Sequence, residues 1–263
     1  MTFHVPTQLR RTIATIALTV TLTVAALVAP ISPLALGTAD ALAGSGHVAT
    51  SLALYDAIAR YAPLDSHAEA AAYRAAMVQA VEPSRERDAR RRLLVAVRTY
   101  PDSPRAADAW ELLGHLAEEP GRTATALANA YRTDPESDRA RQRLTGAAAA
   151  FVEAGSYGKA LAHYGELATA FPDSQARVDV ARGRIALLQG RVEASLGYFE
   201  AAMPYANDPV ARAIAKLGVA SCMERLGNLD GALAELDVID MPDSALAERR
   251  KAISERLGMR NND

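Results

Sequence analysis

Along most of the chain, hydrophobic residues recur three or four positions apart, and short polar phrases that contain Pro or Gly interrupt them. At Ala160, Tyr164 and Leu167, a small residue is followed four positions later by a large one and three positions after that by a second large one. These spacings place all three side chains on one face of an α-helix. The same order recurs at Ala232, Leu236 and Ile239, and the same spacing recurs at Ala194, Tyr198 and Ala201, where the third residue is small. The pattern therefore predicts amphipathic helices.

A phrase of Pro, an acidic residue and Ser separates many of the helical segments. Pro ends the preceding helix, while Ser or Asp can accept a hydrogen bond from the first free amides of the next helix. Successive breaks lie about 34 to 38 residues apart, which is room for two helices and two tight turns. The repeating unit is therefore predicted to be a helical hairpin. The copies are 101–103, 135–137, 172–174 and 242–244, with a looser copy at 63–66 and a related break near 204–208.

A second turn occurs within the hairpins and contains Gly155, Gly190 or Gly227. Gly readily adopts the left-handed backbone conformation in which many helices end, whereas other residues avoid it. Each of these glycines is therefore predicted to end the first helix of its hairpin.

The order small, large, small, aromatic and then Pro is clearest over 141–174, at Leu144, Ala147, Ala148, Phe151, Gly155, Tyr157, Ala160, Tyr164, Leu167, Ala170 and Pro172. This order resembles the tetratricopeptide repeat. The resemblance implies an all-α fold, a right-handed α-α superhelical solenoid of helical hairpins. About five repeats are expected over 44–244, together with a half repeat at 48–64. Residues 245–263 are expected to form a capping helix and a tail, because the last repeat would otherwise expose its apolar face.

The N-terminus has the order of a targeting segment. Arg10 and Arg11 precede an uncharged apolar run over 13–28, and small residues follow up to Ala41 and Ala43. This order predicts a secretory signal that is cleaved after Ala41 or Ala43, and hence export to the periplasm. The apolar stretch is also long enough to cross a bilayer uncleaved, so 1–43 is either a signal peptide or an inner-membrane signal anchor.

Composition narrows the function further. The formal net charge of -2 offers no basic field for nucleic acid, so nucleic acid is not expected as a partner. The single cysteine, Cys222, cannot form an intramolecular disulfide and is expected to be a small buried side chain. No Cys or His cluster has the spacing of zinc ligands, and no phosphate-binding loop is present, so neither metal nor cofactor is predicted.

No catalytic constellation is predicted. Ser156 and Lys159 have the spacing of some serine acyl-enzymes, but they fall on a repeat turn and lack the companion motifs. The charge run over 85–92 is expected to be a solvated helix face with mixed ion pairs. Four histidines lie at unrelated repeat positions and are expected on the surface or in a groove: His47, His67, His115 and His163.

The resemblance implies that the first helices of successive hairpins line a concave groove that binds a partner protein. The polar groove candidates are Arg74, Asp108, His115, Gln142, Thr145, Asp179 and Glu224. The leading hypothesis is a non-enzymatic protein-protein interaction scaffold of the bacterial periplasm or cell envelope. The alternatives are a membrane-anchored accessory subunit of a secretion or polysaccharide-export machine and, more remotely, a hydrolase. Self-association through an uncapped end of the repeats also remains open.

Overall fold

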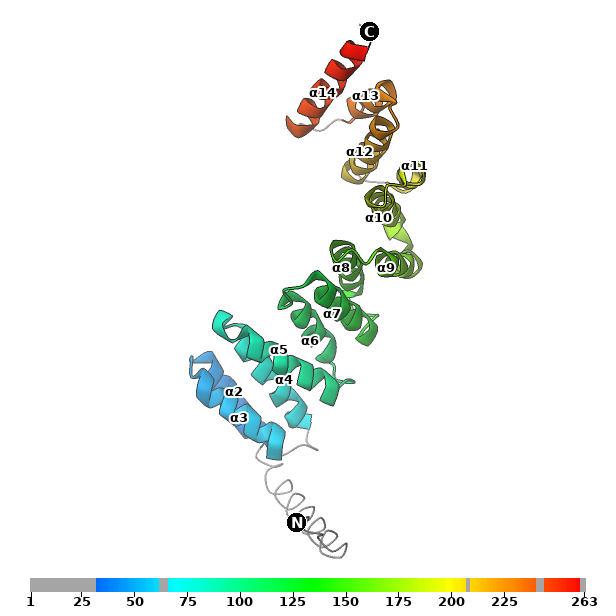
Figure 1. Cartoon of the computed structure of the whole chain (residues 1–263). Coiled ribbons are helices and arrows are strands. Elements are labelled where there is room, and N and C mark those ends of the chain that lie inside the picture. Colours follow the sequence, from blue (N-terminus) through cyan, green and yellow to red (C-terminus); the bar gives the residue numbers. More distant parts are fainter. Residues whose placement is uncertain (1–31, 62–65, 207–208, 240–243, 261–263) are drawn as a thin grey trace, which may run out of the picture. The chain divides into compact units, whose positions relative to one another are not determined.

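The computed structural model describes residues 32–61, 66–206, 209–239 and 244–260, which are mostly helical. These residues form thirteen α-helices and three short 3-10 helices, with no strand among them (Figure 1). The prediction of an all-α fold built from helical hairpins is confirmed. The apolar run over 13–28 lies outside the described residues.

The chain divides into two compact units, and the division falls within α7. Unit 1 takes residues up to 118 together with 125–137, and unit 2 takes 119–124 and the residues from 138 onward. The first helices are α2 (Ser32–Gly44), α3 (Val48–Tyr61), α4 (Ser66–Ala80), α5 (Glu86–Thr99), α6 (Ala106–His115) and α7 (Pro120–Thr133). Then come α8 (Ala140–Glu153), α9 (Tyr157–Ala170), α10 (Gln175–Leu188), α11 (Val192–Ala202), α12 (Pro209–Arg225), α13 (Leu229–Asp237) and α14 (Ser244–Arg260). The 3-10 helices are η2 (Pro83–Arg85), η3 (Pro172–Ser174) and η4 (Met203–Tyr205).

The glycine turns have the predicted left-handed conformation. Gly155, Gly190 and Gly227 have φ angles of 68°, 74° and 81°. In each turn the next residue donates its backbone N–H to a carbonyl five residues back, which satisfies an otherwise free helix end. These hydrogen bonds are 2.8 Å from Ser156 to Phe151, 2.9 Å from Arg191 to Ala186 and 2.9 Å from Asn228 to Met223.

One packing register runs through all the second helices of the hairpins. In each of α3, α5, α7, α9, α11 and α13, a small residue and the residue four positions later are buried. The residue three positions after that is buried as well, and in the last case this residue, Ile239, lies two positions past the end of α13. The triplets are Ser51, Tyr55 and Ile58; Ala89, Leu93 and Ala96; Ala124, Ala128 and Tyr131; Ala160, Tyr164 and Leu167; Ser195, Phe199 and Ala202; and Ala232, Leu236 and Ile239. The predicted periodicity therefore describes the core.

In α11 the predicted register was wrong by one position. The sequence pattern favoured Ala194 and Tyr198, but Ala194 is exposed and the buried pair is Ser195 and Phe199. Ser195 directly follows Ala194, and Phe199 directly follows Tyr198, so both pairs of a small and an aromatic residue have the same spacing of four positions. Ser195 can be buried because its hydroxyl donates a 2.7 Å hydrogen bond to the carbonyl of Gly183.

The first hairpin is complete. The sequence predicted a half repeat over 48–64, but α3 packs against both α2 and α4 (Figure 1). Leu36 and Ala39 of α2 join a buried cluster with Tyr55 and Ile58 of α3. The sequence pattern missed α2 because its mean apolar character continues that of the targeting segment.

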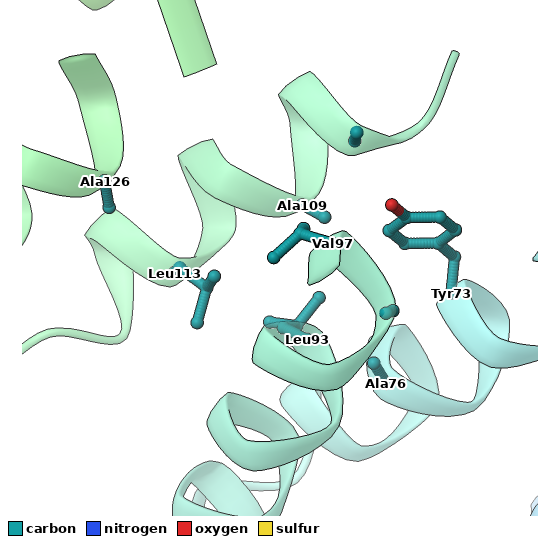
Figure 2. Packing of buried hydrophobic residues seen from close by; sticks show 9 residues of the cluster. Tyr73, Ala76, Leu93, Val97, Ala109, Leu113 and Ala126 are labelled. Carbon is teal, nitrogen blue, oxygen red and sulfur yellow. The ribbon is translucent and has the colours of Figure 1, made fainter. Parts of the chain in front are cut away.

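The core of unit 1 is built where consecutive helices meet. Figure 2 shows Leu93 and Val97 of α5 pointing toward Ala109 and Leu113 of α6, with Tyr73 of α4 beside them. Leu93 is fully buried. Tyr73 donates a 3.0 Å hydrogen bond to the carbonyl of Tyr100, which satisfies its hydroxyl at the edge of the cluster.

In unit 2 one aromatic ring packs against two glycines. Phe199 of α11 is 2% exposed, and a Cβ added at Gly183 of α10 would lie 3.0 Å from its ring. A Cβ added at Gly218 of α12 would come closer still. The lack of side chains at these two positions therefore lets three helices approach around one ring.

The expected C-terminal helix is present as α14 and is anchored in two ways. Ile253 is 1% exposed within an apolar cluster that includes Leu236. Arg249 and Arg256 donate to the carboxylate of Glu224 on α12, at 3.1 Å and 2.6 Å. The helix thus covers apolar side chains of the last hairpin, as a cap does.

Candidate protein-binding site

The predicted groove residues fall in both units. Arg74, Asp108 and His115 lie in unit 1. Arg74 is ion-paired with Asp40 of α2, so its guanidinium links two helices of its own unit. Asp108 and His115 are exposed, and the His115 Nε2 atom lies 4.0 Å from the Glu111 carboxylate.

In unit 2, two of the four predicted residues are occupied by internal contacts. Asp179 is 5% exposed and accepts hydrogen bonds from Gln175 at 2.8 Å and Arg182 at 3.0 Å. Glu224 holds the capping helix. Of the remaining two, Gln142 is exposed and Thr145 is half-buried.

In unit 2, a cavity of about 400 Å³ opens on α8, α10 and α12, which are the first helices of their hairpins. Its apolar side chains come from α10, α12 and η4, and three of them are unusually exposed for large hydrophobic residues. Tyr205, Val210 and Ile214 are 56%, 55% and 44% exposed. An exposed apolar cluster inside a hollow is typical of a binding site rather than of a plain surface. The full lining is Arg141, Asp173, Ser174, Ala176, Arg177, Val180, Tyr205, Val210, Ala211 and Ile214.

The lining of this cavity includes two arginines. Arg141 forms a 2.7 Å ion pair with Asp173, and its guanidinium stacks 5.0 Å from the centroid of the Phe171 ring. Arg177 is exposed on the same lining. With two arginines and one aspartate, the lining has one positive charge in excess. The lining therefore combines exposed apolar side chains with one excess positive charge.

The lining follows the repeat. Thr145, Val180 and Ile214 are each the sixth residue of α8, α10 and α12. The third residues of the same helices are Gln142, Arg177 and Ala211. The sequence predicted Gln142 and Thr145 from these positions but missed the apolar Val180 and Ile214, because polar character was the selection criterion. It missed Arg177 because Asp179 was chosen as the groove residue of α10. The repeat position itself was the signal that could have found them.

Unit 1 has a larger cavity, of about 800 Å³, at the joint between its hairpins. Its lining includes Pro101 and Pro104, which lie between α5 and α6, together with Trp110 of α6 and Arg132 of α7. Its large apolar side chains pack into the core of unit 1, since Val97 is 3% exposed and Trp110 packs against the buried cluster. This cavity therefore offers less accessible apolar surface to a partner than the cavity of unit 2.

Lys159, His163 and the arginines of the charge run over 85–92 contact other side chains of the protein. Lys159 lies over the Phe151 ring at 5.5 Å, and His163 stacks on the same ring at 5.3 Å. In the charge run, Arg92 pairs with Asp56 and Arg90 pairs with Glu118. Within the described ranges, no three His, Cys, Asp or Glu side chains are placed to hold a metal ion.

Cys222 is fully buried, which confirms its predicted role in packing. Its thiol donates to the hydroxyl of Ser195 at 3.4 Å, and burial raises the pKa of the thiol. Since the thiolate is the reactive form, we expect the folded protein to react with Ellman's reagent at least about 100-fold more slowly than the urea-unfolded protein. Equal rates would contradict the burial of Cys222.

No protein-family model and no curated protein matches the chain. Among solved structures, the chain is similar to PilW, a type IV pilus biogenesis factor, with 18% identity, a TM-score of 0.47, and coverage of 83% of this chain and 97% of PilW. It is similar to a tetratricopeptide repeat protein from Parabacteroides merdae, with 12% identity, a TM-score of 0.44, and coverage of 85% and 98%. It is also similar to the quorum sensor NprR from B. thuringiensis, with 13% identity, a TM-score of 0.46, and coverage of 85% and 68%.

The tetratricopeptide-like fold rests on the hairpins of this chain itself, with their shared turns and shared packing register. No described helix combines the length and the apolar character that a bilayer crossing requires.

Proposed function

We propose that this protein is a non-enzymatic scaffold of the bacterial cell envelope that binds a segment of a partner protein in the cavity of unit 2. The observation that carries the proposal is the cluster of exposed apolar side chains, Tyr205, Val210 and Ile214, in a hollow on the first helices. Helical repeats present such concave surfaces for recognition. Gln142 and Thr145 of α8 lie in the same unit and stay groove candidates of this proposal, while Asp108 and His115 stay separate candidates for partner binding within unit 1.

The lining defines the chemistry of the partner segment. An amphipathic helix or an extended strand can place one or two apolar side chains against Val210 and Ile214. A carboxylate beside them would meet Arg177, while Arg141 is already paired with Asp173. We therefore expect a partner segment in which an apolar residue is followed or preceded by Asp or Glu.

The envelope location is proposed from the order of basic, apolar and small residues at the N-terminus. If the apolar run stays in the membrane, the same binding site would belong to an anchored accessory subunit of a secretion or polysaccharide-export machine. Fractionation of cells that express the full chain separates a periplasmic protein from an anchored one. Recovery in the cytosol would contradict both.

The proposed site is tested by a matched pair of substitutions in the full chain. Ile214→Asp places a carboxylate in the cavity, where the Ile214 side chain is 44% exposed. Leu226→Asp places a carboxylate outside the cavity, at a side chain that is 45% exposed. A pull-down from envelope extracts should lose a defined partner at least about tenfold with Ile214→Asp and keep it with Leu226→Asp, since 1.4 kcal/mol of lost apolar contact gives that factor.

The helical circular dichroism of both variants serves as the control for folding. Equal recovery of the partner by Ile214→Asp and by the unaltered chain would rule out this cavity. Turnover of a generic ester or peptide by the purified protein would instead support the hydrolase alternative.

A further inference from the structure

We propose that α2 (Ser32–Gly44) is a permanent part of the mature protein, so that the bonds after Ala41 and Ala43 are not its processing sites. This inference concerns a chain that is exported as proposed above. It replaces the cleavage position predicted from the small residues near Ala41 with one that lies before Ser32, or with no cleavage.

The turn between α2 and α3 has the same geometry as the other glycine turns. Gly46 has a φ of 83°, and His47 donates its backbone N–H to the carbonyl of Leu42 at 2.9 Å. Gly155, Gly190 and Gly227 make the equivalent turns within their hairpins. A turn that is repeated in this detail identifies α2 as the first helix of a repeat.

The residues after the turn extend the equivalence. Ser51, Tyr55 and Ile58 follow Gly46 by five, nine and twelve positions and are 0%, 1% and 2% exposed. Ala160, Tyr164 and Leu167 follow Gly155 by the same intervals and are also buried. The hairpin of α2 and α3 is therefore built to the common plan.

α2 also contributes its own side chains to the core. Ser32, Leu36 and Ala39 are 0%, 6% and 0% exposed, and their spacing of four and then three positions forms one helical stripe. Leu36 and Ala39 pack in one cluster with Leu52 and Tyr55. Removal of α2 would uncover the apolar face of α3.

A polar contact fastens α2 to two other helices. Asp40 accepts a 2.6 Å hydrogen bond from the hydroxyl of Tyr55 on α3, and its second carboxylate oxygen pairs with Arg74 of α4. Without Asp40, the buried tyrosine would lose its partner and Arg74 would lose its counter-charge. A removable targeting segment has no need of such a contact.

Cleavage after Ala43 would also remove three backbone acceptors of the turn, the carbonyls of Ala41, Leu42 and Ala43. Processing during export precedes folding, so burial does not shield these bonds from a protease. The fold shows instead which cleavage product can form the first hairpin, and only a chain that keeps Ser32–Gly44 has both of its helices.

The first test reads the N-terminus directly. The full chain with a C-terminal tag is expressed in an export-competent bacterium, purified from the envelope, and analysed by intact-mass spectrometry and N-terminal sequencing. An N-terminus at or before Ser32 is the expected result. An N-terminus at Leu42, at Gly44 or anywhere after Ser32 overturns the proposal.

A matched pair of variants gives an independent readout. Leu36 is 6% exposed and Leu34 is 75% exposed, and both lie on α2. Leu36→Asp should lower the thermal midpoint of the purified mature protein by about 5–10 °C, while Leu34→Asp should leave it within about 2 °C. Identical midpoints for the two variants overturn the proposal, because they would mean that α2 had been removed from both. Neither readout involves the partner, so failure of the proposed binding site would leave both unchanged.

Discussion

Leu93→Ala is expected to lower the free energy of unfolding of unit 1 by about 2–5 kcal/mol. Leu93 is fully buried in the cluster formed by residues of α4, α5, α6 and α7 (Figure 2). The substitution removes its apolar contacts and leaves a void that the surrounding helices can fill only in part. The loss should be local at first, because each helical repeat contacts mainly its neighbours.

The single tryptophan reports on this change. Trp110 packs against the same cluster, so its fluorescence follows the unfolding of unit 1 in urea. The midpoint should move to lower urea in Leu93→Ala. The control is Val95→Ala on the same helix, where the side chain is 59% exposed and the expected change is within about 0.5 kcal/mol. Equal midpoints for the two variants would show that Leu93 does not pack as described.

Gly218→Ala is expected to destabilise unit 2 by about 1–3 kcal/mol, even though Ala is normally the better helix former. An added Cβ would overlap the ring of Phe199, which is 2% exposed and is also bordered by Gly183. The ring therefore has little room to move aside. Thermal unfolding followed by circular dichroism, together with exposure of the Cys222 thiol in urea, measures the change.

Gly197→Ala is the matched control, with the opposite expected sign. Gly197 lies within α11, is exposed, and has no atom within 4 Å of an added Cβ. The substitution should stabilise the protein by about 0.5–1 kcal/mol, because Ala loses less backbone entropy in a helix. If Gly218→Ala were as stabilising as Gly197→Ala, the packing of Phe199 between glycines would be refuted.

Three features of the fold could be predicted because they depend on neighbouring residues in the chain. The spacing of Ala160, Tyr164 and Leu167 predicted both a helix and its buried face, and Gly155 predicted the turn before it. A helix was also expected within 245–263, where α14 lies. In each case a few consecutive residues carry the whole signal.

The candidate site was less predictable. Arg74 and Glu224 looked available for a partner, but each is paired with a residue of another helix, Asp40 and Arg249 respectively. Ile214 was not among the predicted groove residues, yet it is 44% exposed in a cavity. Availability depends on which side chains meet across helices, and no local pattern contains that information.

The sequence was enough to predict an all-α chain of hairpins with a terminal helix. The signals were the helical periodicity, the Pro-containing breaks between helices and the turn glycines, each of which acts within one or two turns of backbone. Tertiary packing decided the rest. It selected Ser195 and Phe199 over their neighbours, since only Phe199 fits against Gly183 and Gly218. It also made α2 part of the first hairpin, because the apolar residues of a targeting segment and of a packed helix look alike until the side chains that cover them are in place.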